Sequence, residues 1–290
     1  MSRTGYYNWL TRQDSDSSAK KEEQDKKDFE LILLAYNYRG YDKGSRGIHM
    51  RLLRAGIVMN RKKIQRLMRQ FGLKCPIRNP NPYKQMAKAV EEGSVFKNVL
   101  ARRFRENGPR TVILTDITYL FYGPERLIAY LSVMKDAFTK EILAYVLSES
   151  LEEDFVLKTV DIMYMKHGDE LSDDCIIHSD QGIHYKAKAF QKLVKQYNIT
   201  QSMSRKANCW DNAPQESFFG HMKDEVDIDQ AASFSELIVV IDDYMDYYNN
   251  DRPQWELAKL TPSEYYEYCM TGDYPLKDLI GLPNNHNDDK

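Results

Sequence analysis

Three acidic residues stand out by their positions along the chain. Asp116 interrupts LTDITYL, an apolar segment with strand-like patterning in which a charge is unexpected. Asp180 comes directly after the short apolar segment Cys175–His178, and Glu216 lies in a segment with helical patterning. Ligands of α/β proteins gather beyond the carboxyl ends of parallel strands, so a site is expected at Asp180.

Three converging carboxylates repel one another unless a cation lies among them. An all-oxygen ligand set suits Mg²⁺ or Mn²⁺. Two such ions flanking a phosphodiester can activate water and stabilise the leaving oxygen. Taken singly, each acid is better explained as a solvated or capping residue, so only the combination predicts metal-dependent phosphodiester chemistry.

The segment around Glu216 begins as a turn rich in Asn, Asp and Pro and continues as a helix. Glu216, Phe219, Gly220 and Lys223 would share one face of that helix, because positions i, i+3, i+4 and i+7 align. The carboxylate and the ammonium are two turns apart, too far to pair directly. A solvated charge pattern is the plain alternative, and the two upstream aspartates argue against it.

Alternating strand-like segments and helices must position these acids. The β-rich segments are Val112–Tyr122, Leu127–Lys135 and Ile142–Leu147, which predict three consecutive antiparallel strands. A helix over Glu152–His167, the strand Cys175–His178, a helix over Lys186–Tyr197 and the strand Ile199–Met203 follow. This order predicts an α/β fold with a mixed five-stranded sheet.

A basic helical region precedes the sheet. Residues 44–73 have the pattern helix, short turn, basic helix, and Asn60 is a credible N-cap for the second helix. That helix carries five cations and no anion over residues 61–69: Arg61, Lys62, Lys63, Arg66 and Arg69. A helical hairpin with a charged face is the alternative. The basic face favours a helix-turn-helix that contacts DNA through its second helix.

Charge is distributed unevenly over the 290 residues. Residues 1–110 contain 25 Lys and Arg against 11 Asp and Glu, whereas residues 111–290 contain 16 against 32. A basic front half suggests a polyanion-binding module. The longest apolar runs are far shorter than the ~20 residues that cross a bilayer. The start of the chain has no apolar signal core, so we expect a cytoplasmic protein.

These patterns divide the chain into five expected segments. They are an N-terminal segment and linker (1–28), a helix-turn-helix-like DNA-binding domain (29–77), a basic connector (78–110), a catalytic domain (111–270) and a loose C-terminal tail (271–290). The cysteines and histidines are scattered without a zinc-binding spacing, so neither a zinc module nor a disulfide framework is indicated.

The motifs together resemble a known family. TDITYL, HSDQGIHY and SMSRKANCWDNAPQESFFGHMKDE, with 35 residues between Asp180 and Glu216, resemble the DDE transposase–integrase superfamily. More narrowly, the chain resembles the second-reading-frame product of insertion sequence family three, of Gram-positive type. RGIHMRLLRAGIVMNRKKIQRLMRQFGL and YYNNDRPQWELAKLTPSEY extend the resemblance over nearly the whole chain.

The resemblance implies a ribonuclease H-like integrase catalytic core preceded by a small all-α helix-turn-helix domain. Asp116, Asp180 and Glu216 would bind Mg²⁺ or Mn²⁺, two ions per site, and Lys223 would contact DNA at the element's end. The family's reaction is metal-dependent cleavage at a transposon end, followed by attack of the freed 3′-hydroxyl on another phosphodiester. The DNA partners would be terminal repeats and target DNA.

Further expectations concern partners and neighbouring residues. Family members are usually frameshift fusions to an upstream helix-turn-helix and coiled-coil protein, and we expect such a fusion here, together with homo-oligomers assembled on DNA. Arg205 and Lys206 in SMSRKAN are further expected DNA contacts. His178 and His184 flank Asp180, and we expect them to support the site or contact DNA, because an oxygen site suits Mg²⁺.

The sequence departs from the family pattern before the glutamate helix. Ala207 stands where the SRKGN turn usually has Gly, and the usual tryptophan before the first aspartate is missing from RTVILTD. Alanine costs about 1 kcal/mol or more if that turn needs a positive φ. Two alternatives to a transposase therefore stay open: a DNA-binding regulator with an inactive catalytic domain, and a ribonuclease H-like nuclease without strand transfer.

Overall fold

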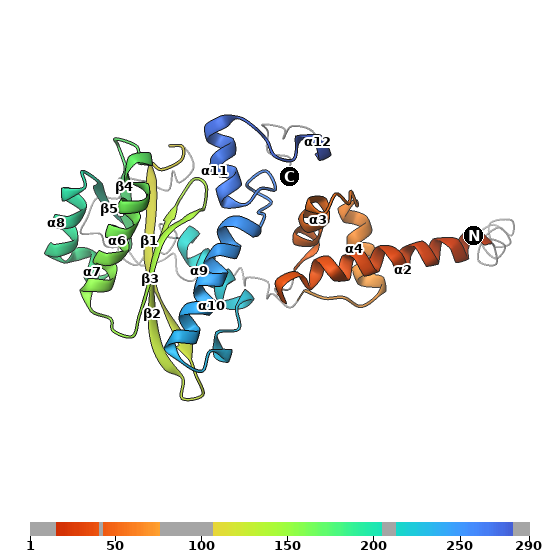
Figure 1. Cartoon of the computed structure of the whole chain (residues 1–290), viewed down its shortest axis with the longest axis horizontal. Coiled ribbons are helices and arrows are strands. Elements are labelled where there is room, and N and C mark those ends of the chain that lie inside the picture. The colour runs from red at the N-terminus through yellow and green to blue at the C-terminus, as the bar shows by residue number, and fades with distance from the viewer. Residues whose placement is uncertain (1–15, 41–42, 76–106, 205–212, 281–290) are drawn as a thin grey trace, which may run out of the picture. The chain divides into compact units, whose positions relative to one another are not determined.

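The computed structural model of the chain describes residues 16–40, 43–75, 107–204 and 213–280 (Figure 1). Its contacts divide the chain into two compact units. One comprises Met1–Ile77 with Leu276–Lys290, and the other comprises Arg78–Pro275. Across the described ranges, no helix is both long and apolar enough to span a membrane.

The first unit is helical, as the sequence predicted. Its helices are α2 (Asp16–Tyr36), the short η1 (Tyr38–Gly40), α3 (Ser45–Arg54) and α4 (Arg61–Gln70). They bury a common apolar core that includes Ile32, Ile48 and Leu67. The Asn60 side chain caps α4 by accepting a hydrogen bond from the Lys62 backbone amide at 2.8 Å, which confirms the predicted start of that helix.

Helix α2 begins earlier than the sequence led us to expect. Residues 16–28, assigned to a linker, are helical from Asp16 onward. Two ion pairs at i, i+4 spacing, Glu22 with Lys26 and Glu23 with Lys27, support this polar half of the helix. The apolar residues that anchor α2 to the core begin only at Phe29, so apolar periodicity alone could not locate the helix start.

The second unit is built on a mixed five-stranded sheet in the order β3-β2-β1-β4-β5. Strands β1 (Val112–Tyr122), β2 (Leu127–Asp136) and β3 (Ile142–Ser148) are antiparallel neighbours. Strands β4 (Ile176–Ser179) and β5 (Thr200–Met203) extend the sheet from β1 in parallel. The predicted α/β class, the strand number and the antiparallel start of the sheet are confirmed.

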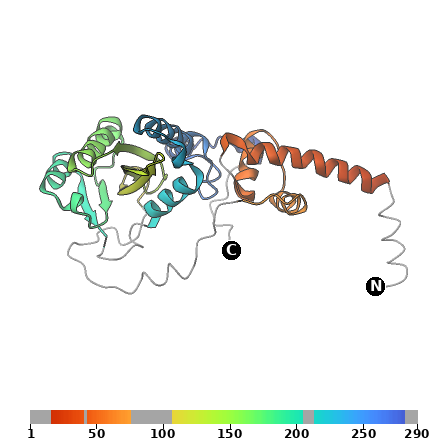
Figure 2. The same ribbon diagram turned by 90° about the horizontal axis from the view of Figure 1, so that it is seen from below.

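Helices cover both faces of this sheet (Figures 1 and 2). One side carries α6 (Glu153–His167), η3 (Gly168–Glu170), α7 (Ile183–Lys186) and α8 (Lys188–Gln196). The other side carries α9 (Ala213–Glu225) and α10 (Phe234–Asp246), with η5 (Ile228–Gln230) between them and the π-helical turn η6 (Tyr247–Asp251) after them. The helix α11 (Pro262–Thr271) follows in this unit, whereas α12 (Lys277–Ile280) belongs to the first unit.

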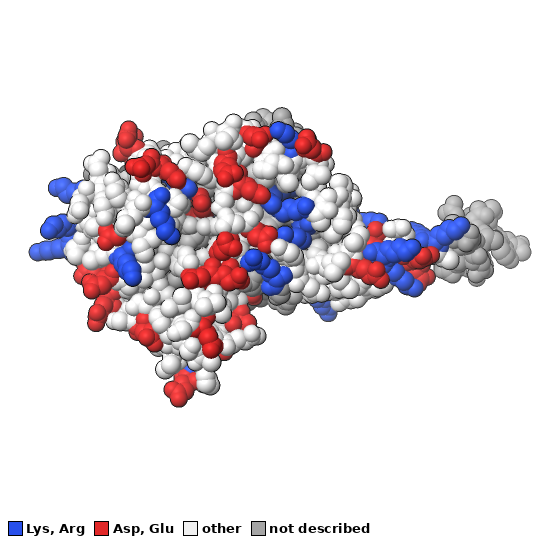
Figure 3. Space-filling view, viewed as in Figure 1, with Lys and Arg blue, Asp and Glu red and all other residues white. Residues whose placement is uncertain are grey.

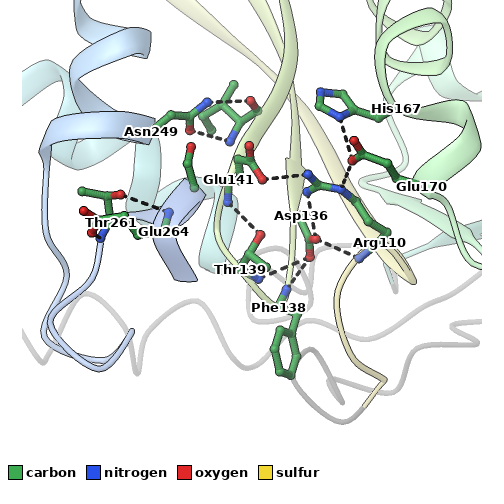
Figure 4. A network of polar contacts seen from close by, with 12 residues as sticks. Arg110, Asp136, Phe138, Thr139, Glu141, His167, Glu170, Asn249, Thr261 and Glu264 are labelled. Carbon is green, nitrogen blue, oxygen red and sulfur yellow. Dashed lines mark hydrogen bonds and ion pairs between the residues drawn. The ribbon is translucent and has the colours of Figure 1, made fainter. Parts of the chain in front are cut away.

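Buried polar contacts hold the beginning of the sheet together (Figure 4). Arg110 directly precedes β1, and its guanidinium bonds Glu141 at 2.8 Å and Glu170 at 2.9 Å, while its backbone amide donates to Asp136 at 2.8 Å. The Tyr266 ring packs against the same guanidinium. Arg110 therefore ties the start of β1 to the ends of neighbouring elements and to α11.

The C-terminal region is better packed than expected. The sequence predicted a loose tail from residue 271, but Tyr274 is 1% exposed and its hydroxyl donates to the Ala258 carbonyl at 2.8 Å. Gly272 ends α11 with a φ of 74°, a left-handed conformation that glycine adopts without strain. One buried tyrosine gives too little sequence periodicity to reveal such packing. Residues 281–290 lie outside the described ranges.

Candidate active site

Strand β1 positions Asp116 in the middle of the sheet. The residue lies opposite Val133 of β2 and is half-buried. Its Oδ1 atom accepts a hydrogen bond from the Ile117 backbone amide at 2.8 Å, which fixes the carboxylate. The charge that interrupts the apolar strand pattern is therefore held at a defined point on the sheet.

Asp180 lies beside Asp116 because of the strand register. Leu114 of β1 pairs in parallel with His178 of β4, and the two aspartates each follow their paired residue by two positions. Side chains two positions apart on a strand point to the same face. The parallel register thus brings the two aspartates side by side, with Asp116 inside β1 and Asp180 directly after the carboxyl end of β4.

Gly182 allows the tight turn that holds Asp180. The Gly182 amide donates to Asp180 Oδ1 at 2.8 Å, and a Cβ at this glycine would lie 2.9 Å from the same oxygen. It would also press on the Tyr185 ring at 3.3 Å. Any side chain at position 182 would therefore displace the carboxylate or the tyrosine.

Glu216 approaches this pair from the first turn of α9, where it is exposed. Its charge acts on Asp116, whose pKa is raised from 3.8 to about 7. Burial is the largest cause of that shift, the charge of Asp180 adds to it, and Glu216 contributes further. The three predicted carboxylates therefore come from β1, from the turn after β4 and from α9, and the charges of Asp180 and Glu216 act on Asp116.

The donor set suits a hard divalent cation. Among the described residues, no group of three or more His, Cys, Asp or Glu side chains is arranged as it stands to hold a metal ion. Still, carboxylates that oppose one another's ionisation are the groups that a divalent ion between them would stabilise in the charged form. The residues present therefore fit Mg²⁺ or Mn²⁺ by charge and by oxygen chemistry.

Helix α9 presents only part of the predicted stripe. Phe219 is 6% exposed and packs inward, whereas Glu216 and Lys223 are exposed. Gly220 lies between them on the helix, and a Cβ there would meet nothing within 4 Å. The exposed face thus offers a carboxylate and an ammonium two turns apart, separated by an open position.

Lys135 is a residue that the sequence reading missed. It lies on β2 opposite Leu114, is 2% exposed, and donates a hydrogen bond from Nζ to the Pro214 carbonyl in the first turn of α9. Burial, followed by the charge of Lys140, lowers its pKa to about 7, while Asp116 opposes that shift. A cation at the end of the apolar segment LIAYLSVMK was the signal that could have revealed it.

The two histidines near Asp180 are engaged with protein atoms. His178 is fully buried in β4, with Nδ1 2.9 Å from the Ser202 hydroxyl. His184 has Nε2 2.8 Å from the Leu151 carbonyl and lies edge-on to the Phe155 ring. Their burial suits the expected supporting role and leaves little surface for contact with DNA.

A buried ion pair anchors the far end of α9. Arg252 bonds both carboxylate oxygens of Glu225, through Nε at 2.9 and 3.1 Å and through Nη2 at 2.5 Å. The Tyr244 hydroxyl also donates to Glu225, at 3.1 Å. The arginine of the NNDRPQ segment thus fixes the helix that carries Glu216.

Two of the five predicted DNA-binding cations on α4 serve the fold of the helical unit. Arg66 forms a bidentate ion pair with Asp25 of α2, with both distances 2.7 Å, and Lys63 pairs with Asp28 at 2.5 Å. Lys62 and Arg69 are exposed, and Arg61 is half-buried. Arg205, Lys206 and Ala207 lie outside the described residues.

Comparison with known proteins agrees with this architecture. The chain matches the "Integrase core domain" family over residues 106–209 and again over residues 197–262, and the "HTH-like domain" family over residues 23–81. It is 36% identical over 223 residues to the putative transposase InsK for insertion sequence element IS150 of Escherichia coli. That alignment covers 77% of this chain and 76% of the relative.

More distant similarities extend the set. The transposase InsF for insertion sequence IS3A of Escherichia coli is 26% identical, over 78% of this chain and 75% of its own. Among solved structures, a chain of the simian T-cell lymphotropic virus intasome in complex with PP2A regulatory subunit B56 gamma superposes with a TM-score of 0.49 and 14% identity, covering 84% of this chain and 77% of that chain. With its integrase core, its helix-turn-helix-like domain and these relatives, the chain belongs to the insertion-sequence transposases of the IS3 family.

Proposed function

We propose that this protein cleaves DNA at the ends of an insertion sequence and joins the freed 3′-hydroxyl to target DNA. The observation that carries the proposal is the parallel register of β1 and β4, which runs Asp116 alongside Asp180, together with the charge of Glu216 acting on Asp116. Relatives named as transposases of insertion sequences support the same reaction.

In this proposal the three carboxylates hold two Mg²⁺ or Mn²⁺ ions. When bound, such ions activate the attacking oxygen and stabilise the leaving oxygen of a phosphodiester. The backbone amides of Ile117 and Gly182 hold the two aspartates in place. Lys223, exposed on α9, contacts the phosphate backbone near the scissile bond.

DNA binding by the helical unit supplies the rest of the recognition. Lys62 and Arg69 are exposed on α4 and are the foremost candidates for contacts to the terminal repeats, with Arg61 beside them. Arg205 and Lys206 are proposed to contact DNA close to the active site. The expected partners are an upstream-frame helix-turn-helix and coiled-coil product, fused by frameshifting, and further copies of this chain assembled on DNA.

The test removes one carboxylate charge at a time. Asp116→Asn or Glu216→Gln is expected to lower the rate of cleavage of end-containing DNA by more than ~100-fold. Even the loss of a residue that only orients a metal ligand lowers metal affinity or activity by ~10–100-fold. DNA binding should survive. Asp173→Asn and Glu125→Gln, exposed acids of the same unit, are the matched controls. A Glu216→Gln protein that cuts at the full rate would refute the assignment.

A DNA-binding regulator is the second candidate, and Ala207 before the glutamate helix favours it. The chain should be assayed alone and fused to the upstream product, on DNA that carries the terminal repeats. Metal-dependent 3′-end cleavage by either form excludes the regulator. A strand-transfer assay with pre-cut ends separates a transposase from a ribonuclease H-like nuclease.

A further inference from the structure

A buried cation joins the sheet to the helix that carries the third carboxylate. Lys135 is 2% exposed, and its Nζ donates to the Pro214 carbonyl, two residues before Glu216. The ammonium also lies 5.4 Å from the centroid of the Phe218 ring, one turn further along α9. Burying an ammonium is costly unless its contacts compensate, so this lysine calls for an explanation.

The register of β1 and β2 relates Lys135 to Asp116. Lys135 pairs with Leu114, and Asp116 pairs with Val133, so the lysine and the aspartate are diagonal neighbours on one face. Diagonal neighbours of this kind are ~7–8 Å apart. The side chain of Lys135 therefore lies between the position of Asp116 on the sheet and the first turn of α9.

We propose that Lys135 is a positioning residue, which holds the first turn of α9 against β2 and thereby sets Glu216 opposite Asp116. The role rests on the proposed metal site. Gln215, in the same turn, is fully buried, and within the described ranges neither polar atom of its side chain has a hydrogen-bond partner. Gln215 therefore does not attach this turn to the sheet, whereas the hydrogen bond from Lys135 to the Pro214 carbonyl does.

The direction in which Mn²⁺ affinity changes when Lys135 is removed separates a positioning role from simple charge balance. If Lys135 only neutralised the carboxylates, its removal would leave the site more negative and tighten Mn²⁺ binding. If it holds the Glu216 helix, its removal weakens Mn²⁺ binding, because residues that orient metal ligands contribute ~10–100-fold to affinity. A purely structural role would leave Mn²⁺ binding unchanged apart from any loss of folding.

The experiment uses the full chain and Mn²⁺ alone, read as the metal-dependent rise in melting temperature. Lys135→Met keeps the side-chain length and removes the ammonium, and Lys158→Met is the same change at an exposed lysine. We expect Lys135→Met to raise the Mn²⁺ concentration for half of the rise by ~10-fold or more. Its metal-free melting temperature, measured alongside, separates a loss of folding from a loss of Mn²⁺ affinity.

Each other outcome has a defined meaning. Unchanged or tighter Mn²⁺ binding by Lys135→Met overturns the positioning role. Glu216→Gln, measured in parallel, should abolish the Mn²⁺-dependent rise. If Glu216→Gln leaves that rise intact, the metal site itself is wrong, and this failure is distinct from a failure at Lys135.

An independent observation concerns the charge of α7 and α8. The catalytic half contains twice as many acids as cations, yet residues 181–210 contain six Lys and Arg and no Asp or Glu. Lys188, Lys192 and Lys195 are exposed at i, i+4 and i+7 of α8, while Phe190 and Val194 of the same helix are buried. Figure 3 shows basic side chains gathered over α8.

We infer that this lysine stripe, Lys188, Lys192 and Lys195, binds the phosphate backbone of duplex DNA. An acidic domain repels DNA, so an acid-free basic stripe is where phosphates can approach. The stripe lies on α8, on the face of the sheet opposite the one that α9 covers. The inference rests on a DNA substrate and does not depend on catalysis.

Salt dependence tests the stripe without metal. The affinity of the full chain for a duplex of unrelated sequence is measured across salt concentrations, and each lost phosphate contact lowers the slope by ~0.9. Lys188→Gln with Lys192→Gln should lower it by ~1.8. Lys158→Gln with Lys166→Gln, two exposed lysines of α6, should leave it unchanged. Equal slopes for both double variants overturn the inference.

Discussion

Asp116 carries the most perturbed carboxyl group of the candidate site. Burial, the charge of Asp180 and the charge of Glu216 together raise its pKa to about 7, against the usual 3.8. The backbone amide of Ile117 and the ammonium of Lys135 oppose the shift. In the absence of metal, the site therefore takes up a proton as the pH falls through neutrality, and a divalent ion competes with that proton.

This shift predicts a pH dependence of stability in the metal-free protein. A carboxyl group with a raised pKa in the folded state stabilises the fold fully below its unfolded pKa of 3.8, and this contribution is lost as pH rises through about 7. We expect the melting temperature in chelator to fall over that window relative to Asp116→Asn, which lacks the titrating group. Saturating Mn²⁺ should remove the difference in slope.

Parallel melting curves of the two proteins check this prediction. The difference between the two proteins reports the Asp116 carboxyl together with the effect of its charge on the pKa of Lys135. If the wild-type and Asp116→Asn proteins show the same dependence on pH, the carboxyl of Asp116 titrates near its ordinary value and is not coupled to its neighbours.

At the scale of elements, helices are held in place by hydrogen bonds and ion pairs that the sequence pattern alone does not reveal. Helix α9 is attached at its start through Lys135 and Pro214, and at its end through Glu225 and Arg252. Helix α4 is attached to α2 through Arg66 and Asp25. A cation on a basic helix face can therefore stabilise the packing of helices instead of contacting DNA.

The two kinds of cation on α4 predict different mutant behaviour. Arg66→Ala leaves Asp25 without its bidentate partner, so we expect the helical unit to lose about 1 kcal/mol, a modest value because the Arg66 side chain is 43% exposed. Arg69→Ala should leave the melting temperature unchanged and weaken DNA binding, with the salt slope lower by ~0.9.

Thermal unfolding and DNA titration of both variants test whether Arg66 stabilises the fold and Arg69 binds DNA. A larger loss of DNA affinity in Arg66→Ala than in Arg69→Ala, at an unchanged melting temperature, would mean that the ion pair opens and that Arg66 contacts DNA. Lys63, paired with Asp28, should behave like Arg66.

At the scale of the whole molecule, charge separates two tasks. The basic residues 1–110 include the helix-turn-helix-like unit, and the acidic remainder carries the three carboxylates. An acidic domain that acts on DNA needs local exceptions to its charge, and Lys223 with the lysine stripe of α8 are such exceptions. The contacts of Arg110 with Glu141 and Glu170 fix the start of the sheet at the position where the basic part of the chain ends.

The sequence by itself determined the fold class and most strand and helix positions, and it singled out the three acids as the candidate site. These features depend on the spacing of apolar residues, on the helix cap at Asn60 and on a charge such as Asp116 within an apolar strand. Each of these signals lies within a short stretch of sequence. The sequence did not reveal the start of α2 or the packing of Tyr274, because neither produces a repeating pattern of apolar residues.

Only the tertiary structure decided which residues meet. The parallel register of β1 and β4 sets Asp116 beside Asp180, although 63 residues separate them. Lys135 and Pro214 are 79 positions apart, and Arg66 and Asp25 are 41 apart. Such contacts depend on burial and on strand register, which arise from the packing of the whole chain and have no signature in any single segment.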